Sequence, residues 1–271
     1  MKVLKQLIDA AERMCKGDFT VRARETGPDP LMRLGNSLNR LSDEMVRMQE
    51  EQKVITHALN HEIRTPLARL RLAMDMMQSP GSGKTSAALL QKMDRDIDEM
   101  EMLAKEMLQW ARLTHRQEQV NMGPIALGRM VHELIGDLSE LNPHVSIIPT
   151  VPSAFFCTGN LPLLRQALIN TIRNAQKYAN TEIHIGLETN ETTVSLIIDD
   201  DGPGIPKKDR ERIFIPFKCL DESRSRQTGG VGLGMAIVHQ IMIAHGGFAR
   251  ADRSPLGGAR IHLSWEKGPL A

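Results

Sequence analysis

The stretch N-H-E-I-R-T-P-L, residues 60–67, places a histidine, two charged side chains and a proline inside a long pattern of helical periodicity. His61, Arg64 and Thr65 follow an i, i+3, i+4 spacing, which puts them on one face of a helix. Pro66 has no amide hydrogen for the carbonyl four residues earlier, so a bend is expected just after the histidine. The pattern predicts an exposed imidazole beside a carboxylate, although a histidine on an ordinary solvated helix face fits the same residues.

Apolar residues at heptad spacing continue on both sides of this stretch. Before it they are Leu31, Leu34, Leu38, Leu41, Met45 and Met48, and after it Ile63, Leu67, Leu70, Met74 and Met77. A second run follows at Leu90, Met93, Ile97, Met100, Ala104, Met107 and Ala111. Because Q-S-P-G-S-G-K-T at 78–85 interrupts the pattern, residues 53–116 are predicted to form an antiparallel helical hairpin. Two hairpins from two chains would close a four-helix bundle, so a homodimer is expected.

Length and composition narrow the protein class. The chain has 271 residues, enough for about two domains or more, and its formal net charge of +1 offers no basic surplus for nucleic acid. Its three cysteines are far apart and form neither a disulfide framework nor a metal-ligand spacing. No run of 18 apolar residues occurs, so no membrane-spanning helix is predicted.

Residues 1–50 are predicted to form two helices around a turn-rich linker. The first helix carries Leu4, Leu7, Ala11 and Met14 and breaks at Gly17, where G-D-F occupies 17–19. This helix, linker and helix arrangement resembles a HAMP domain, the signal relay of sensor proteins. A generic dimeric coiled coil fits the same apolar spacing.

From about residue 124 the pattern changes to mixed helices and strands. Arg112–Pro124 is polar and is predicted to be a linker. The predicted helices are Ile125–Leu138, Leu161–Tyr178 and Gly232–His245. The predicted strands are His144–Pro152, Thr181–Leu187, Thr192–Ile198 and Ala259–Trp265, with a hairpin turn at Asn190. Helices combined with mostly antiparallel strands indicate a two-layer α/β sandwich and an α+β multidomain chain.

Three polar segments in this region stand out. N-T-I-R-N-A-Q-K-Y at 170–178 puts Asn170 and Asn174 on one helix face, where core amides are the alternative. D-D-D-G-P-G-I at 199–205 ends a strand, where a solvated turn is the alternative. G-G-V-G-L-G at 229–234 opens an apolar helix, which suits phosphate binding. Between the last two segments, residues 213–228 indicate a lid.

The order and spacing of these segments resemble the sensor histidine kinases of two-component systems, of the EnvZ, CpxA and RstB type. The resemblance covers nearly all of the chain. It implies a HAMP-like relay at 1–50, a dimerisation and histidine phosphotransfer (DHp) domain at 51–116 that forms the dimeric four-helix bundle, a linker at 117–123, and a catalytic ATP-binding domain at 124–271. The last would have the Bergerat fold, the α/β sandwich of the GHKL ATPases.

The resemblance implies roles for the residues after Asn60. His61 would accept the phosphoryl group, and Glu62 would orient the imidazole and take its proton. Arg64 would contact the phosphoryl group. Thr65 would position a water for the reverse activity, which removes the phosphoryl group from the partner's aspartate.

The resemblance also implies an ATP and Mg²⁺ site. Asn174 would hold Mg²⁺, Asp200 would accept a hydrogen bond from the adenine amino group, and Arg226 would steady the γ-phosphate. The other nucleotide-binding residues implied are Asn170, Lys177, Tyr178, Gly202, Gly204, Phe214, Phe217, Gly230, Gly232, Leu233 and Gly234. Ile215 and Met235 depart from the residues usual in the family, but neither departure removes a functional group.

The function implied is an ATP-dependent protein-histidine autokinase. It would phosphorylate His61, pass the phosphoryl group to an aspartate of a response regulator, and dephosphorylate that regulator. The chain would be the soluble cytoplasmic portion of a bacterial inner-membrane protein, joined to the membrane through a missing N-terminal segment. The alternatives are a GHKL-fold ATPase and a catalytically inactive dimeric scaffold. The hairpin with His61 argues against the ATPase, and intact Asn174 and Asp200 argue against the scaffold.

Overall fold

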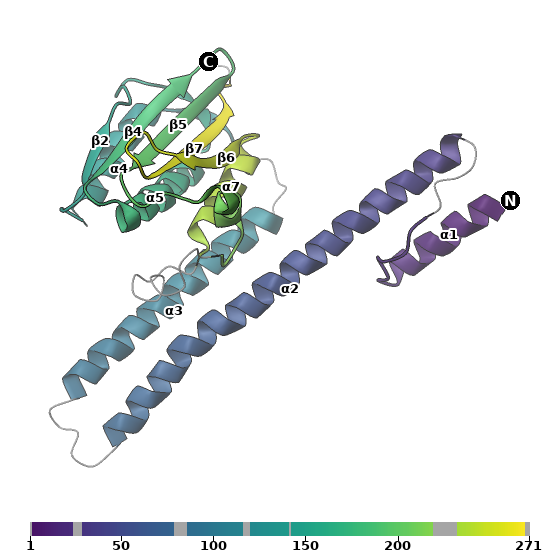
Figure 1. The fold of residues 1–271 in the computed structure, drawn as a ribbon, viewed down its shortest axis with the longest axis horizontal. Helices are drawn as coiled ribbons and strands as arrows, with labels where there is room; N and C mark the ends of the chain where they lie inside the picture. Colours follow the sequence, from purple (N-terminus) through teal and green to yellow (C-terminus); the bar gives the residue numbers. More distant parts are fainter. Residues whose placement is uncertain are drawn as a thin grey trace. The chain divides into compact units, whose positions relative to one another are not determined.

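The computed structural model describes residues 2–23, 29–78, 86–115, 120–140, 142–218 and 232–268. The chain divides into two compact units, Met1–Arg64 and Thr65–Ala271, and each is described by itself. Figure 1 labels the helices and strands. Among the described residues, no helix is both long and apolar enough to cross a membrane.

The first unit contains α1 (Lys2–Cys15) and the first part of α2 (Asp29–Gln78). Its small core consists of Leu7, Ala10 and Ala23, with Val3, Val21, Leu31 and Leu38 packed around them. The segment between the helices is tied to α2 by Asn39, whose carboxamide bonds to both the N–H and the carbonyl of Ala23 at 2.7 and 3.0 Å. The predicted break at Gly17 is confirmed, with α1 ending at Cys15 and Gly17 at φ +89°.

Helix α2 is much longer than predicted. The sequence suggests a second HAMP helix followed by a separate hairpin helix, but the structure has one helix of 50 residues. Pro66 lies inside it, and the helix continues to Gln78, where the predicted interruption begins. The rest of that interruption, residues 79–85, lies outside the described residues.

The antiparallel hairpin is supported by an ion-pair cluster between the end of α2 and α3 (Ser86–His115). Arg69, nine residues before the end of α2, contacts Asp96, ten residues after the start of α3, at 2.9 Å. The same guanidinium contacts Glu99 at 2.5 Å. Pairing at nearly equal distances from the interruption is what an antiparallel hairpin requires.

Part of the predicted apolar face of α3 is exposed in the single chain, while a neighbouring series of residues is buried. Leu90 and Ile97 are 49% and 46% exposed, whereas the buried residues repeat every seven positions at Leu89, Asp96, Leu103 and Trp110. The 90, 97, 104 and 89, 96, 103 series have the same heptad spacing, so periodicity alone does not decide which one faces inward. The exposed series leaves apolar surface on α3 of the single chain.

Replacing Arg69 with leucine is expected to destabilise the hairpin by about 2 kcal/mol, because Asp96 would remain buried without its counter-ion. The value lies below that of a fully buried pair because the Arg69 side chain is 44% exposed. Calorimetric unfolding would measure the loss. Arg71→Leu, on an exposed site of the same helix, should change little, and adding Asp96→Leu to Arg69→Leu should restore stability. A double variant no more stable than Arg69→Leu would contradict this account.

The second unit also contains an α/β sandwich. Its main sheet has the order β2-β4-β5-β7-β6, formed by Ser146–Pro149, Glu182–Thr189, Thr193–Asp200, Ala259–Glu266 and Phe248–Arg253. Strand β2 pairs with β4 in parallel, and the other pairs are antiparallel. Helices α4 (Leu127–Ser139), α5 (Leu161–Tyr178) and α7 (Gly234–Ala244) form the second layer (Figure 1). The predicted two-layer sandwich is confirmed.

Most predicted elements of this layer are present, with corrections at their ends. The hairpin at Asn190 is confirmed, since its side chain accepts hydrogen bonds from Thr192 and Thr193. The linker predicted from Arg112 is wrong at both ends, because α3 runs to His115 and strand β1 (Gly123–Ile125) has begun by Pro124. Strands β1, β3 (Cys157–Gly159) and β6 are absent from the sequence prediction. The first two form a separate antiparallel pair.

Candidate functional site

Helix α5 begins where its sequence predicts and carries the two predicted asparagines. Asn160 caps it by accepting the N–H of Leu163 at 3.1 Å. Asn170, further along, donates to the carbonyl of Gly234 at 3.2 Å, which joins α5 to the start of α7. Asn174 is half-buried, and its carboxamide has no hydrogen-bond partner among the described residues. A carboxamide oxygen of this kind is suited to a hard cation or a phosphate-bound water.

Asp200 is held by the main chain at the end of β5. It is 5% exposed, and its Oδ1 accepts the N–H groups of Gly202 at 2.9 Å and Ala259 at 3.0 Å. Within the described part of the chain, no hydrogen bond reaches its Oδ2. Burial raises the pKa of Asp200, while the two backbone hydrogen bonds lower it. Asp200 therefore presents one fixed oxygen acceptor to a ligand.

The three consecutive aspartates, 199–201, differ in their hydrogen-bond partners. Asp199 forms two hydrogen bonds of 2.7 Å with the Arg260 guanidinium on β7. Burial raises the pKa of Asp201, but hydrogen bonds from Thr181, Asn180 and Glu182 outweigh this effect and bring it to about 2. Of the three, only Asp200 keeps a carboxylate oxygen without a partner among the described residues, so the solvated-turn alternative does not describe it.

Glycines give the main chain room to close around Asp200. A Cβ on Gly202 would lie 2.4 Å from the carbonyl oxygen of Tyr178, and Gly204 has φ +74°. The sequence prediction missed Gly258, where a Cβ would lie 2.2 Å from Oδ1 of Asp200. The sequence feature that could have indicated Gly258 is the turn pattern S-P-L-G-G-A at 254–259, which leads into the predicted strand.

Substituting Gly258 with alanine is expected to displace Asp200 and destabilise the sandwich by about 2–4 kcal/mol, because the new methyl group would overlap carboxylate and backbone atoms. Affinity for the ATP that the sequence predicts should fall by at least about tenfold, since the Asp200 acceptor moves. Gly136→Ala is the matched control. It lies in α4 with open space at Cβ and should be neutral or stabilising by up to about 1 kcal/mol. Thermal unfolding and nucleotide titration measure both; equal effects of the two changes would contradict the prediction.

The segment after the aspartates meets the start of α7. Phe214 is buried and its ring lies 5.8 Å from that of His239 on α7. Phe217 has φ +60°, and its N–H donates to the carbonyl of Gly232 at 3.1 Å. Gly232 has φ +77°, and Leu233 is fully buried ahead of α7. The predicted residues Arg226 and Gly230 lie outside the described residues.

Lys177 and Tyr178 end α5 beside this region. The ammonium group of Lys177 lies 5.5 Å from the centre of the Tyr178 ring. Both side chains are half-buried. The structure therefore brings α5, the Asp200 turn and the start of α7 together: Asn170 bonds to Gly234, and Gly202 packs on Tyr178. No group of three or more His, Cys, Asp or Glu suited to a metal ion occurs among the described residues.

His61 lies on α2 with 72% of its side chain exposed. Its Nδ1 lies 3.3 Å from Oε1 of Glu62. Arg64 and Thr65 are also exposed on the same helix. The predicted exposed imidazole beside a carboxylate is thus present.

Three family models match the chain. Residues 4–47 match the HAMP domain, residues 51–116 the His Kinase A (phospho-acceptor) domain, and residues 159–269 the histidine kinase-, DNA gyrase B-, and HSP90-like ATPase family. Together they cover most of the chain.

Curated relatives and solved structures agree with these matches. The chain is 35% identical to Sensor protein RstB of Escherichia coli K12, over 94% of this chain and 58% of that protein. It is 31% identical to Sensor histidine kinase CpxA of the same strain, over 96% of this chain and 57% of that protein. The chain thus spans less than two thirds of these relatives. The Acinetobacter baumannii histidine kinase AdeS shares the fold, with TM-score 0.61 and 21% identity over 77% of this chain and 98% of that one.

Proposed function

Because this chain belongs to the sensor histidine kinases of two-component systems, we propose that it transfers the γ-phosphoryl group of ATP to His61 and then to an aspartate of a response regulator. The observation that carries the proposal is the pairing of an exposed His61–Glu62 couple with a fixed, unpaired carboxylate oxygen on Asp200. The first supplies a nucleophile, and the second suits a nucleotide base.

The nucleotide would lie between α5, the Asp200 turn and the start of α7. The open oxygen of Asp200 would accept the adenine amino group, with Gly202 and Gly204 allowing close approach of the main chain. Gly232, Leu233 and Gly234 would direct backbone N–H groups at the phosphates, since they open a helix. The residues proposed to complete the site are Asn170, Lys177, Tyr178, Phe214, Phe217, Arg226 and Gly230.

Asn174 is the residue proposed to hold Mg²⁺. Its carboxamide is half-buried and without a partner among the described residues, which fits an oxygen ligand to a hard cation. When bound, Mg²⁺ neutralises phosphate charge that would otherwise oppose attack on phosphorus. A single protein oxygen is sufficient because phosphate and water oxygens complete such sites.

The chemistry at His61 follows from its contact with Glu62. A carboxylate 3.3 Å from Nδ1 favours the tautomer with its proton on Nδ1, so the lone pair that would attack is the one on Nε2. A bond forms from Nε2 to the γ-phosphorus, the bond to the bridging oxygen breaks, and ADP leaves. The Nδ1 proton passes to Glu62. Arg64 would contact the transferred group.

We further propose that the chain is a homodimer that recognises a receiver domain and also dephosphorylates it. The exposed apolar residues Leu90 and Ile97 on α3 support a second copy in a four-helix bundle. The domain division proposed is 1–50, 51–116, 117–123 and 124–271. It is supported by the matched ranges and by β2 and α4, which pack into the same sandwich as β4 and α5. The cytoplasmic side of a membrane sensor is the proposed location.

Incubation with γ-labelled ATP and Mg²⁺ tests the kinase proposal. An acid-labile, base-stable label is expected, since a phosphorus–nitrogen bond is hydrolysed in acid. A label that survives acid would mean transfer to a hydroxyl group and would overturn the assignment. Nucleotide hydrolysis without protein labelling would favour a GHKL-fold ATPase instead.

Changing Thr65 to alanine is expected to slow dephosphorylation of a phosphorylated receiver domain by about 10-fold to 100-fold, because a hydroxyl that orients the attacking water is lost. Labelling of His61 should change less than about threefold, since Thr65 does not supply the nucleophile. Release of labelled phosphate from the receiver measures the reverse reaction. Thr56→Ala, at another exposed position of α2, should leave both reactions intact. Equal loss in both reactions would contradict a water-positioning role.

A further inference from the structure

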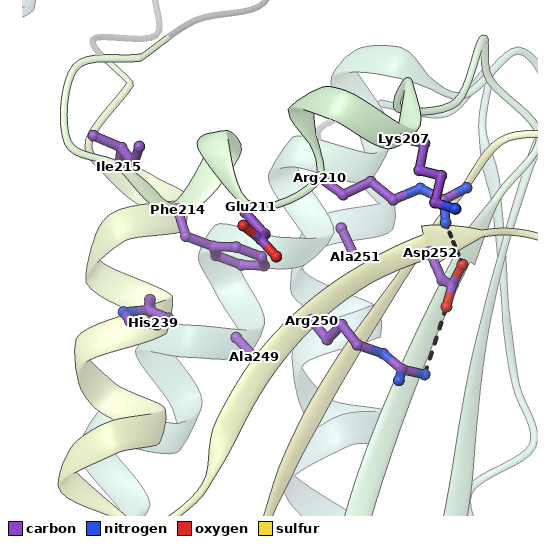
Figure 2. Close-up of a pocket in the computed structure, with 10 residues that line it drawn as sticks. All are labelled: Lys207, Arg210, Glu211, Phe214, Ile215, His239, Ala249, Arg250, Ala251 and Asp252. Atoms are coloured by element: carbon purple, nitrogen blue, oxygen red, sulfur yellow. Dashed lines mark hydrogen bonds and ion pairs between the residues drawn. The ribbon is translucent and has the colours of Figure 1, made fainter.

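A cavity lies beside the segment that carries Phe214. It has a volume of about 430 Å³, within the range of small-molecule sites. Its walls come from the 3₁₀ turns η1 (Lys207–Asp209) and η2 (Arg212–Phe214), from α7 and from β6 (Figure 2). Among the described residues, Phe214 is the only one proposed for the nucleotide site that also lines this cavity, so the cavity is distinct from the Asp200 site.

The inner wall of this cavity is apolar. Ala249 and Ala251 project from β6 toward the helix layer, and their small side chains leave space beneath Phe214 (Figure 2). His239 adds a second ring beside Phe214, with 35° between the ring planes. Burial lowers the pKa of His239, so it contributes a neutral ring. A flat apolar group the size of one ring fits such a wall.

The outer rim is charged and open. Strand β6 is the last strand of its sheet, and among the described residues it pairs only with β7. The four consecutive residues 249–252 all line the cavity although their side chains alternate between faces, so the cavity extends around the free edge of β6. A ligand can therefore enter from solvent.

Among the described residues, the rim charges sum to one positive charge. Asp252 is already engaged by Arg210 at 2.5 Å, and Arg250 contacts it more loosely at 3.5 Å with 61% of its side chain exposed (Figure 2). Lys207 has no ion-pair partner among the described residues, and neither does the one other acid, Glu211. Three cations against two acids leave one positive charge, which suits a monoanion better than a polyphosphate.

We propose that this cavity binds a small organic monoanion, a carboxylate attached to an apolar ring, with the ring against Phe214 and Ala249 and the carboxylate at Arg250 and Lys207. The proposal does not depend on phosphotransfer, because it requires only binding. Phe214, which an occupant would contact, lies three residues before Phe217 in the chain. The N–H of Phe217 donates a hydrogen bond to the carbonyl of Gly232.

The test is binding of 4-(trifluoromethyl)benzoate to the full chain, followed by fluorine NMR in the absence of nucleotide. The uncharged 4-(trifluoromethyl)benzyl alcohol should bind at least about fivefold more weakly, because it lacks the carboxylate. Arg250→Ala should weaken benzoate binding by about fivefold or more. Ala249→Leu should abolish it by filling the cavity. Arg253→Ala removes a cation from the same strand outside the cavity and should change binding by less than about twofold.

Three results would overturn the proposal. They are no binding at millimolar benzoate, equal binding of acid and alcohol, and unchanged binding by Arg250→Ala. Thermal unfolding checks that the Ala249→Leu variant folds. If it does not fold, benzoate binding by the Arg250→Ala variant alone tests the proposal. Since no step uses ATP, failure here leaves the kinase proposal standing, and failure of His61 labelling leaves this one standing.

Discussion

Replacing His61 with alanine is expected to reduce acid-labile labelling by ATP at least about 10³-fold, because the proposed nucleophile is removed and no neighbouring group replaces it. ATP affinity should remain within about twofold, since His61 plays no part in the proposed nucleotide site. Filter-bound label from γ-labelled ATP, beside a nucleotide titration, separates the two effects.

The control for this variant is His57→Ala. His57 is exposed and lies one turn before His61 on the same face of α2, so it matches His61 in residue type, exposure and helix position. Labelling should be retained. If His57→Ala lost the label and His61→Ala kept it, the phosphoacceptor would have been assigned to the wrong histidine.

Changing Asp200 to asparagine is expected to weaken ATP binding by about 30-fold to 150-fold, the effect of losing one hydrogen bond to a buried charged acceptor. The N–H groups of Gly202 and Ala259 would hold the new amide oxygen, so the amide nitrogen would face the adenine amino group. Two donors would then oppose each other. Isothermal titration with a non-hydrolysable ATP analogue measures the change.

Asp201→Asn is the control for the Asp200 variant. Its carboxylate is committed to Thr181 and Asn180 and does not share the open position of Asp200. It should lower thermal stability slightly while ATP affinity stays within about twofold. Equal losses of affinity from both changes would indicate a general disturbance of the turn instead of a direct contact with the base.

The elements that the sequence predicted well have strong local signals. Helix α5 has the predicted bounds because Asn160 caps it and Pro162 stands in its first turn, where proline is tolerated. The Asn190 hairpin was predictable because its side chain satisfies backbone N–H groups within three residues. Within the candidate site, Asn170, Asp200 and Gly234 were predicted from the order and spacing of their segments, and the structure brings these segments together.

The missed elements lack such signals. Strands β1 and β3 have three residues each, too few for an alternating pattern. Strand β6 reads F-A-R-A-D-R and has no β-branched residue. The bounds of α2 were missed for another reason, because a continuing heptad does not mark where one domain ends and the next begins. Gly258 was missed because the side chain that requires a glycine there, Asp200, lies 58 residues earlier in the sequence.

The fixed carboxylate of Asp200 has a consequence for which purine the proposed nucleotide site would accept. With one oxygen held by two main-chain amides, the side chain cannot turn to offer anything but an acceptor. Guanine carries a carbonyl oxygen where adenine carries its amino group, so two acceptors would meet with no hydrogen between them. A buried mismatch of this kind costs about 2–4 kcal/mol, so ATP should be preferred over GTP by about 30-fold to 1,000-fold. That discrimination would be enforced by the backbone of Gly202 and Ala259 as much as by the aspartate itself.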